Sequence, residues 1–191
     1  MHLRIYNEQT DFTYIASWIQ DERTHALWCA NLLSYPLSKD EFHNYLKEQG
    51  LKFNSQSRSD PYPKEKEHDG AYVYADDRDR PMGFFVFTVN KQDQSGFLRF
   101  IMVDSTVRGR GYGGQMLGQL LQYAYENAGV AAVRLLVFDV NDAAMKCYRK
   151  LGFTVMDNTP ANFPYQNETW KRYMMEHRSL LNSPISPILK P

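Results

Sequence analysis

Residues 103–114 form a glycine-rich stretch: Val103-Asp104-Ser105-Thr106-Val107-Arg108-Gly109-Arg110-Gly111-Tyr112-Gly113-Gly114. The chain holds 11 glycines in 191 residues, and five of them fall within positions 109–118. Glycine lets the backbone turn tightly and lets its N–H groups approach a ligand without a Cβ in the way. The stretch therefore predicts a tight turn with accessible backbone amides.

The residues on either side of the glycines predict a strand that leads into a helix. Residues 96–103 are mostly large and apolar, as in a strand. After the glycines, apolar residues recur at a spacing of three to four, as on one face of a helix that ends near Gly129: Met116, Leu117, Leu120, Leu121, Ala124 and Ala128. A helix N-terminus offers free amides and a partial positive charge, and Arg108 and Arg110 add to that charge. The junction predicts a phosphate or pyrophosphate site, with a plain structural turn as the alternative.

Two common phosphate-binding motifs do not fit the glycines. The Walker motif needs Lys followed by Ser or Thr, whereas Gln115 and Met116 follow Gly114. The Rossmann motif needs Gly-x-Gly-x-x-Gly directly after the first strand, whereas these glycines have another spacing and lie in mid-chain. We therefore expect neither a nucleotide triphosphatase nor a dinucleotide enzyme.

The rest of the chain predicts one α/β (α+β) domain with a central mixed, mostly antiparallel sheet. We expect six or seven strands flanked by about four helices. Helical patterns cover Phe12 to Ile19 and Phe42 to Leu46, and a polar loop spans 50–70. A further helix is expected over 141–151. Strands are expected over 3–6, 71–75, 83–89, 96–103, 132–138, 153–156 and 169–177, and the apolar run 132–138 is typical of a strand buried on both faces.

Composition and charge narrow the function. Lys and Arg number 22 and so do Asp and Glu, so no overall charge favours nucleic acid or an anionic membrane as partner. Cys29 and Cys147 are the two cysteines, and neither lies at metal-ligand spacing, so we expect two buried thiols and no metal. Two thiols fit a reducing compartment, and no apolar run is long enough to span a membrane. We expect a cytoplasmic protein.

Two segments, taken together, resemble the GNAT superfamily of N-acetyltransferases. Arg108-x-x-Gly111-x-Gly113 resembles the acyl-CoA loop of that family, and Asn141-x-x-Ala144-x-x-x-Tyr148-x-x-x-Gly152-Phe153 resembles its second motif, thirty residues on from Gly111. One loop can match by chance, whereas both in this order rarely do. The segment Trp18-Ile19-Gln20-Asp21-Glu22, followed by Leu27-Trp28, is similar to the branch that includes ribosomal-protein N-terminal acetyltransferases.

The resemblance implies a single acyl-CoA N-acyltransferase domain over residues 1–180. Within it, residues 1–70 would form the acceptor-side helices and polar loop, 71–156 the sheet and cofactor core, and 157–180 the closing strand region. Residues 181–191 are expected to form an extended tail. We expect a monomer or a homodimer.

The resemblance also implies acetyl-CoA as cosubstrate and assigns residues to it. Backbone groups of Ile101, Met102 and Val103 would pair with its pantetheine arm where the fourth and fifth strands splay apart. Asn141 would hydrogen-bond the same arm, although asparagine is also a good helix N-cap and both roles can hold. The pyrophosphate would be wrapped by Arg108, Gly109, Arg110, Gly111, Tyr112, Gly113 and Gly114.

Tyr148 is the catalytic residue that the resemblance implies, as the general acid that protonates the departing CoA thiolate. It lies two helical turns after Asn141, so both side chains share one helix face. The alternative is an aromatic residue of the core.

No general base stands out in the sequence. Leu136 occupies the position where ribosomal-protein alanine acetyltransferases carry a glutamate, and the fourth strand offers only Arg99. The candidates are Glu22, His25 and Asp139, with a water chain as the alternative.

The first two helices, the 50–70 loop and the last strands would build the acceptor site. Their aromatic residues either line that site or pack in the core: Trp18, Trp28, Tyr35, Tyr62, Phe163, Tyr165 and Trp170. The expected function is acetyl transfer to a primary amine, either a protein N-terminus or a small molecule, by direct attack in a ternary complex. A non-catalytic acyl-CoA-binding or regulatory module with the same fold is the alternative.

Overall fold

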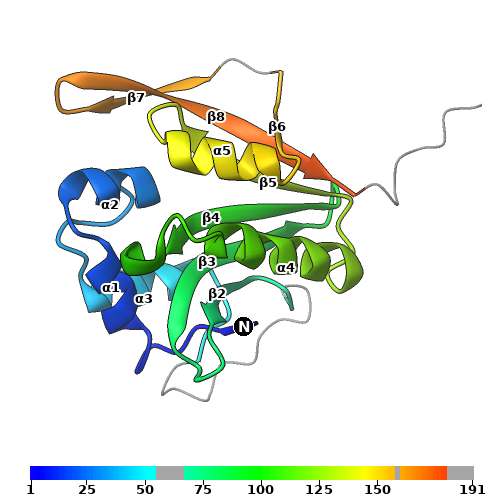
Figure 1. The fold of residues 1–191 in the computed structure, drawn as a ribbon, viewed down its shortest axis with the longest axis horizontal. Coiled ribbons are helices and arrows are strands. Elements are labelled where there is room, and N and C mark those ends of the chain that lie inside the picture. Colours follow the sequence, from blue (N-terminus) through cyan, green and yellow to red (C-terminus); the bar gives the residue numbers. More distant parts are fainter. Residues whose placement is uncertain (55–66, 158–159, 180–191) are drawn as a thin grey trace, which may run out of the picture.

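The computed structural model describes residues 1–54, 67–157 and 160–179. Most of the predicted 50–70 loop and the predicted tail 181–191 lie outside these ranges. Eight strands form one sheet in the order β1-β2-β3-β4-β5-β8-β6, and β7 also pairs with β8 (Figure 1). The strands are β1 (His2–Ile5), β2 (Gly70–Ala75), β3 (Pro81–Asn90), β4 (Ser95–Val103), β5 (Ala132–Phe138), β6 (Thr154–Val155), β7 (Ala161–Tyr165) and β8 (Glu168–Arg178).

The sheet is mixed and mostly antiparallel, as predicted, because only the β4–β5 pair is parallel among the described strand pairs. The count of eight strands exceeds the predicted six or seven. The additional strand is β7, which contains Pro164. Proline cannot donate to a strand ladder, so it lowers any sequence-based expectation of a strand and is tolerated only at an edge such as this one.

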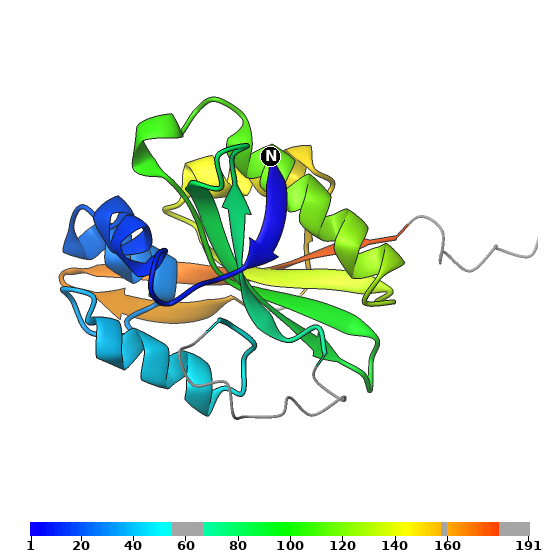
Figure 2. The same ribbon diagram turned by 90° about the horizontal axis from the view of Figure 1, so that it is seen from below.

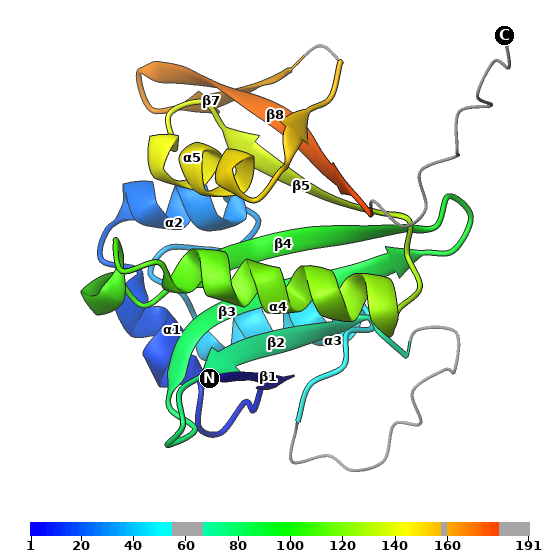
Figure 3. The ribbon, with the colours of Figure 1, turned by 45° about the vertical axis from the view of Figure 1, so that its right-hand side comes forward.

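In the described residues, five α-helices cover the two faces of the sheet, against about four predicted. Figure 2 shows α4 and α5 on one side and α3 on the other, and Figure 3 shows α4 lying along the strands. Two buried clusters separate the faces: one joins α4 and α5 to the sheet, and the other joins α1 and α3 to its opposite face. The helices are α1 (Phe12–Trp18), α2 (Glu22–Cys29), α3 (Lys39–Glu48), α4 (Tyr112–Glu126) and α5 (Asp142–Lys150).

The helix starts follow from side chains that replace missing backbone partners. The Asp21 carboxylate accepts a hydrogen bond from the Thr24 amide at 2.6 Å, and the Ser38 hydroxyl accepts one from the Glu41 amide. Asp11 stands at the start of α1 but makes no capping bond there. Its buried carboxylate instead accepts bonds from the Arg4 guanidinium at 2.6 and 3.0 Å, which ties α1 to β1.

A bulge in β4 and a splay beside it shape the centre of the sheet. Val86 of β3 pairs with Arg99 and Phe84 with Met102, so β4 carries one residue more than β3 between these pairs. The extra residue is Phe100, whose φ is +54°. Past Leu98 and Leu135, no further pairing between β4 and β5 is present in the described strands. The two strands therefore splay apart, as predicted.

The prediction that residues 132–138 are buried on both faces is wrong at one position. Val133, Leu135 and Val137 are buried against α4 and α5. On the opposite face, Phe138 is buried but Leu136 is 37% exposed. The splay explains this difference, because β4 no longer lies beside Leu136 and nothing in the described chain covers it.

Candidate active site

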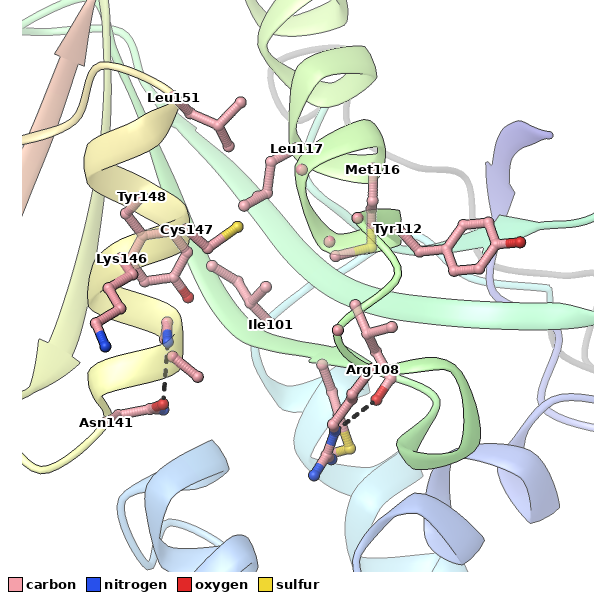
Figure 4. Close-up of a pocket in the computed structure, with 18 of the residues that line it drawn as sticks. Ile101, Arg108, Tyr112, Met116, Leu117, Asn141, Lys146, Cys147, Tyr148 and Leu151 are labelled. Atoms are coloured by element: carbon pink, nitrogen blue, oxygen red, sulfur yellow. Dashed lines mark hydrogen bonds between the residues drawn. The ribbon is translucent and has the colours of Figure 1, made fainter.

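A cavity of about 670 Å³ lies between α4 and α5 where the strands splay (Figure 4). Size alone suits a small ligand, since ligand pockets usually measure about 300–1,000 Å³. Of the predicted site residues, those lining it are Ile101, Met102, Val103, Arg108, Gly109, Gly111, Tyr112, Gly113, Gly114, Asn141 and Tyr148. Arg110 is exposed and does not line it, which places this predicted residue at the rim of the loop.

The glycines open the cavity at the N-terminus of α4. Gly109 and Gly111 have φ of +78° and +85°, in the left-handed region that glycine adopts without strain. A Cβ on Gly111 would meet no other atom within 4 Å, so conformation and not crowding requires glycine there. Gly111 is the N-cap of α4, and the amides of the first turn after it lack helix partners. Figure 4 shows the Tyr112 ring turned away from α5, so Tyr112 offers the cavity mainly its backbone.

Asp104 fixes the loop that precedes these glycines. It is 1% exposed, and one of its oxygens accepts hydrogen bonds from the Thr106 amide at 2.9 Å and from the Thr106 hydroxyl at 2.8 Å. Its other oxygen pairs with the Arg80 guanidinium at 2.9 Å. Arg108 then donates to the Val103 carbonyl at 3.3 Å. Sequence reasoning missed this role of Asp104, and the only signal was its place between the strand and the glycines.

Asn141 performs the capping role that the sequence left open. Its side-chain oxygen accepts a hydrogen bond from the Ala144 amide at 3.2 Å and so starts α5. Its NH₂ group has no hydrogen-bond partner within residues 1–54, 67–157 and 160–179, and the residue lines the cavity. One side chain thus holds the helix and still offers two donors to a ligand.

Tyr148 packs in the core and also reaches the cavity. It is 6% exposed, and its ring lies 5.9 Å from that of Phe153. Its hydroxyl has no hydrogen-bond partner in the described part of the chain, and Figure 4 shows it on the cavity side of α5. Burial raises the pKa of Tyr148 far above its usual value, because the phenolate is poorly solvated there. The residue is therefore a neutral phenol at physiological pH, with a proton to give.

Trp28 links α2 to the bulge in β4. Its indole N–H donates to the Phe100 carbonyl at 2.8 Å, and the two rings lie 5.2 Å apart. Trp28 lines the cavity together with Thr24 and Leu27, so α2 forms the wall opposite α5. The sequence placed Trp28 among the acceptor-side aromatics but gave no sign of this hydrogen bond.

A family of known proteins shares the sequence pattern of this chain. A model described as the acetyltransferase (GNAT) family matches residues 35–153, which is more than half of the chain. The chain belongs to this family. The predicted N-acetyltransferase is thereby confirmed at the level of the family, whereas the finer resemblance to ribosomal-protein acetyltransferases is not confirmed.

Solved structures show the same GNAT fold. A complex of spermidine N-acetyltransferase from Vibrio cholerae with CoA and spermine aligns over 93% of this chain and 94% of that chain, with a TM-score of 0.71 and 16% identity. A protein assigned as a phosphinothricin N-acetyltransferase aligns over 93% and 97%, with a TM-score of 0.67 and 15% identity. A dodecameric form of the V. cholerae enzyme aligns over 93% and 92%, with a TM-score of 0.65 and 15% identity. Such likeness establishes the fold, whereas the substrate has to be inferred from the residues of the site.

None of the three candidate bases lines the cavity of this GNAT protein in the described ranges. Glu22 is exposed, and an Asp139 oxygen accepts a bond from the Lys171 amide at 3.0 Å. His25 is 1% exposed and contacts the Cys29 sulfur at 3.4 Å, and burial lowers its pKa. Because none of the three described side chains lines the cavity, the water chain is the alternative that this geometry leaves open.

The acceptor-side aromatics mostly form the core of the GNAT fold. Trp18 is buried with α1, and Tyr165 and Trp170 stack at 4.3 Å beside Phe138 and Ala26 of α2. Tyr62 lies outside the described residues. Of the set, only Trp28 lines the cavity in the described part of the chain.

Metal sites and membrane spans are both absent from the described residues. Within them, no group of three or more His, Cys, Asp or Glu side chains is placed to hold a metal ion. Their helices are also too short or too polar to cross a membrane.

Proposed function

We propose that this GNAT protein is an acetyl-CoA-dependent N-acetyltransferase that moves the acetyl group to a primary amine in a ternary complex. One observation carries the proposal: a single cavity joins the glycine-capped N-terminus of α4 to the unpartnered hydroxyl of Tyr148. The first feature suits a phosphate, and the second suits a leaving group that needs a proton.

The described residues suit two parts of acetyl-CoA, the pyrophosphate and the pantetheine arm. The free amides after Gly111 and the guanidinium of Arg108 suit the pyrophosphate. The backbone of Ile101 to Val103 has no β5 partner, so its edge can pair with the amides of the pantetheine arm. The free NH₂ group of Asn141 faces the same space.

Acetyl-CoA supplies an activated thioester, and this chain supplies position and a proton. The amine nitrogen attacks the thioester carbon, the C–N bond forms, and the C–S bond breaks. The proton of Tyr148 goes to the departing sulfur, and the proton of the amine passes to water, through which the Tyr148 phenolate is protonated again. Trp28 holds the bulge in β4 through its hydrogen bond to the Phe100 carbonyl. In this proposal the thioester carbonyl of acetyl-CoA lies beside that bulge, so the reacting groups meet at the splay.

The compartment and the assembly state are further parts of the proposal. Cys29 is buried and Cys147 half-buried, and both are free, which suits a reducing compartment such as the cytoplasm. A monomer or homodimer is the expected assembly.

Titration calorimetry with acetyl-CoA tests the donor, and release of free thiol over a panel of amines tests the transfer. The panel contains spermidine, phosphinothricin, peptides with free N-termini and single amino acids. Binding with turnover of at least one amine is expected. Binding without turnover on any of them would favour the non-catalytic acyl-CoA module, and absence of binding would overturn both functions.

A further inference from the structure

The sheet face that carries α2 and α3 shows two arginines beside the splay. On β5, Leu136 and Phe138 point to this face, because Leu135 and Val137 pack against α4 and α5. On β8, Arg172 and Met174 share it, since Met175 is buried on the opposite side. On β4, Arg99 faces α3.

Arg172 is the first of the two. It is half-buried, and its Nε atom is buried without a hydrogen-bond partner. No ion pair to its guanidinium exists among residues 1–54, 67–157 and 160–179. A buried donor that lacks a partner is energetically unfavourable, and more so when it is charged. The protein carries that cost at this position for a reason that its own contacts do not supply.

Arg99 is the second. It donates to the Tyr45 hydroxyl at 3.1 Å and to the Gln49 side-chain oxygen at 3.4 Å, both on the α3 side and both neutral. Its Nε atom is also buried and unpartnered. No carboxylate pairs with it in the described structure, so its charge is held in place but not neutralised.

Other partly buried arginines of this chain are neutralised. Arg4 pairs with Asp11 at 2.6 Å, and Arg134 pairs with Asp93 at 2.6 Å and with Glu176 at 2.8 Å. These pairs show the usual arrangement, in which a guanidinium fork meets a carboxylate. The two unpaired arginines depart from it.

The strand register places the two arginines around Leu136. Leu98 pairs with Leu135, so Arg99 follows at the level of Leu136, and Arg172 lies beside Phe138 on the far side of β5. Two strand spacings, about 10 Å, separate the arginines across the strands, and a two-residue offset, about 7 Å, separates them along β5, before the splay widens the gap. Arg99 also directly precedes Phe100, whose carbonyl is bonded to the cavity-lining Trp28. Both arginines therefore border the splay on the sheet face opposite α4 and α5.

We propose that Arg99 and Arg172 bind the carboxylate of the acceptor, and that the acceptor is a small amino acid whose α-amine receives the acetyl group. The inference rests on the proposed function, because it names the class of amine. A carboxylate supplies the planar pair of acceptors that guanidinium groups lack here. Leu136 lies on the strand between the arginines, and Met174 pairs with it on β8. The two side chains give the acceptor an apolar floor, which favours an apolar amino-acid side chain.

Matched acceptors test the carboxylate directly. The series is L-phenylalanine, L-phenylalaninamide and phenethylamine, with L-methionine and L-methioninamide as a second set, each assayed by thiol release with acetyl-CoA. We expect kcat/KM to be tenfold to a hundredfold higher for the acids than for their amides, as for a charge-assisted hydrogen bond. Equal or better use of the amides would overturn the inference. So would a wild-type protein that uses none of the five and shows no heat with either acid in the presence of CoA.

Variants then assign the preference to the two arginines. In Arg172→Gln and Arg99→Gln, the ratio of kcat/KM for acid over amide falls at least tenfold, while Arg78→Gln, in an exposed turn, keeps the wild-type ratio. Calorimetry with acetyl-CoA shows that each variant is folded. A variant that is not folded is replaced by lysine at the same position, Arg172→Lys or Arg99→Lys, which retains part of the preference. An unchanged ratio in the folded variants would overturn the inference. Loss of acetyl-CoA binding by the wild type would instead overturn the proposed function.

Discussion

Tyr148 combines two roles that the sequence could only offer as alternatives. Its ring is part of the buried cluster under α4 and α5, and its hydroxyl borders the cavity without a partner in the described chain. The packing of the ring fixes where the hydroxyl lies, so the core supplies the precision that proton transfer needs. Burial raises its pKa, so the hydroxyl stays protonated at neutral pH.

Replacing Tyr148 with phenylalanine separates the packing role of the ring from the proton-donating role of the hydroxyl. Tyr148→Phe keeps the ring and removes the proton, so kcat should fall about 10²- to 10⁴-fold, the usual size of a general-acid contribution. The acetyl-CoA affinity, measured by calorimetry, should stay within about twofold. Tyr123→Phe, which also removes a hydroxyl but lies outside the cavity, should keep the wild-type kcat. A wild-type rate for Tyr148→Phe would remove the general-acid assignment.

Trp28 is a positioning residue, because it acts through the Phe100 carbonyl. Trp28→Phe keeps an aromatic ring against Phe100 but loses the 2.8 Å hydrogen bond, which is worth about 0.5–1.5 kcal/mol. We expect kcat to fall roughly threefold to tenfold through a looser bulge. Trp18→Phe, in the buried cluster with α1, controls for the loss of an indole elsewhere. A fall in thermal stability alone, with kcat unchanged, would show that the bond is merely structural.

The sequence could predict those site residues whose partners are close along the chain. Asn141 and Tyr148 are two turns apart on one helix, so spacing alone relates them. The Trp28–Phe100 bond spans 72 residues, and the Arg80–Asp104 pair spans 24. Such contacts depend on how the helices pack on the sheet, which no local pattern encodes. The unpaired state of Arg172 belongs to the same class, because a missing partner is visible only once every neighbour is placed.

At the scale of the element, the N-terminus of α4 depends on one backbone conformation. Gly111 has φ of +85°, where a residue with a Cβ is strained by about 1–2 kcal/mol. Gly118 lies in the interior of the same helix with an ordinary φ, and a Cβ added there would meet no other atom within 4 Å. A methyl group therefore has room at both positions, but only Gly111 has a backbone conformation that disfavours it.

Alanine at these two positions should therefore have opposite effects. Gly111→Ala should lower the free energy of unfolding by about 1–2 kcal/mol and weaken acetyl-CoA binding, since the first-turn amides would shift. Gly118→Ala should raise the same free energy by about 0.5–1 kcal/mol and leave binding unchanged. Urea unfolding and calorimetry measure both quantities. Tight acetyl-CoA binding by Gly111→Ala would contradict the role given to the α4 N-terminus.

Periodicity was enough to predict the long elements but not the irregular ones. The apolar run of β5 lies where the sequence puts it, and α4 carries the predicted apolar spacing but ends at Glu126, three residues before Gly129. The bulge at Phe100 has no local mark, because phenylalanine rarely adopts a φ of +54° and does so here within a sheet whose neighbours hold it. The exposure of Leu136 also has no local mark, because it results from the splay between β4 and β5, and that splay depends on how the two strands pair.

At the scale of the whole molecule, packing on the two faces of the sheet removes three histidine side chains wholly or partly from solvent. His43 is 6% exposed and meets the Tyr6 hydroxyl at 2.7 Å, His25 is 1% exposed, and His177 is half-buried. Burial lowers the pKa of each, because the imidazolium would lose solvation. The folded protein therefore binds fewer protons than the unfolded chain just below pH 6.5.

Stability should accordingly rise with pH between 5.5 and 7.5. Where the unfolded state binds more protons, the free energy of unfolding increases with pH. Each histidine kept neutral down to pH 5.5 lowers the free energy of unfolding by up to about 1.4 kcal/mol between pH 7.5 and pH 5.5. The carboxylates whose pKa is lowered, such as Asp79 and Glu168, lose their contribution only at more acidic pH. Urea unfolding at the two pH values measures the difference.

Two variants show whether the burial of His43 accounts for part of this dependence. His43→Gln removes one titrating group, so the difference in unfolding free energy between pH 7.5 and 5.5 should shrink. Tyr6→Phe removes only the hydrogen bond to His43 and should keep most of the difference, because burial is the larger cause of the lowered pKa. An equal difference in His43→Gln and the wild type would contradict a role for His43. A wild-type stability that falls as pH rises through this window would contradict the contribution of all three histidines.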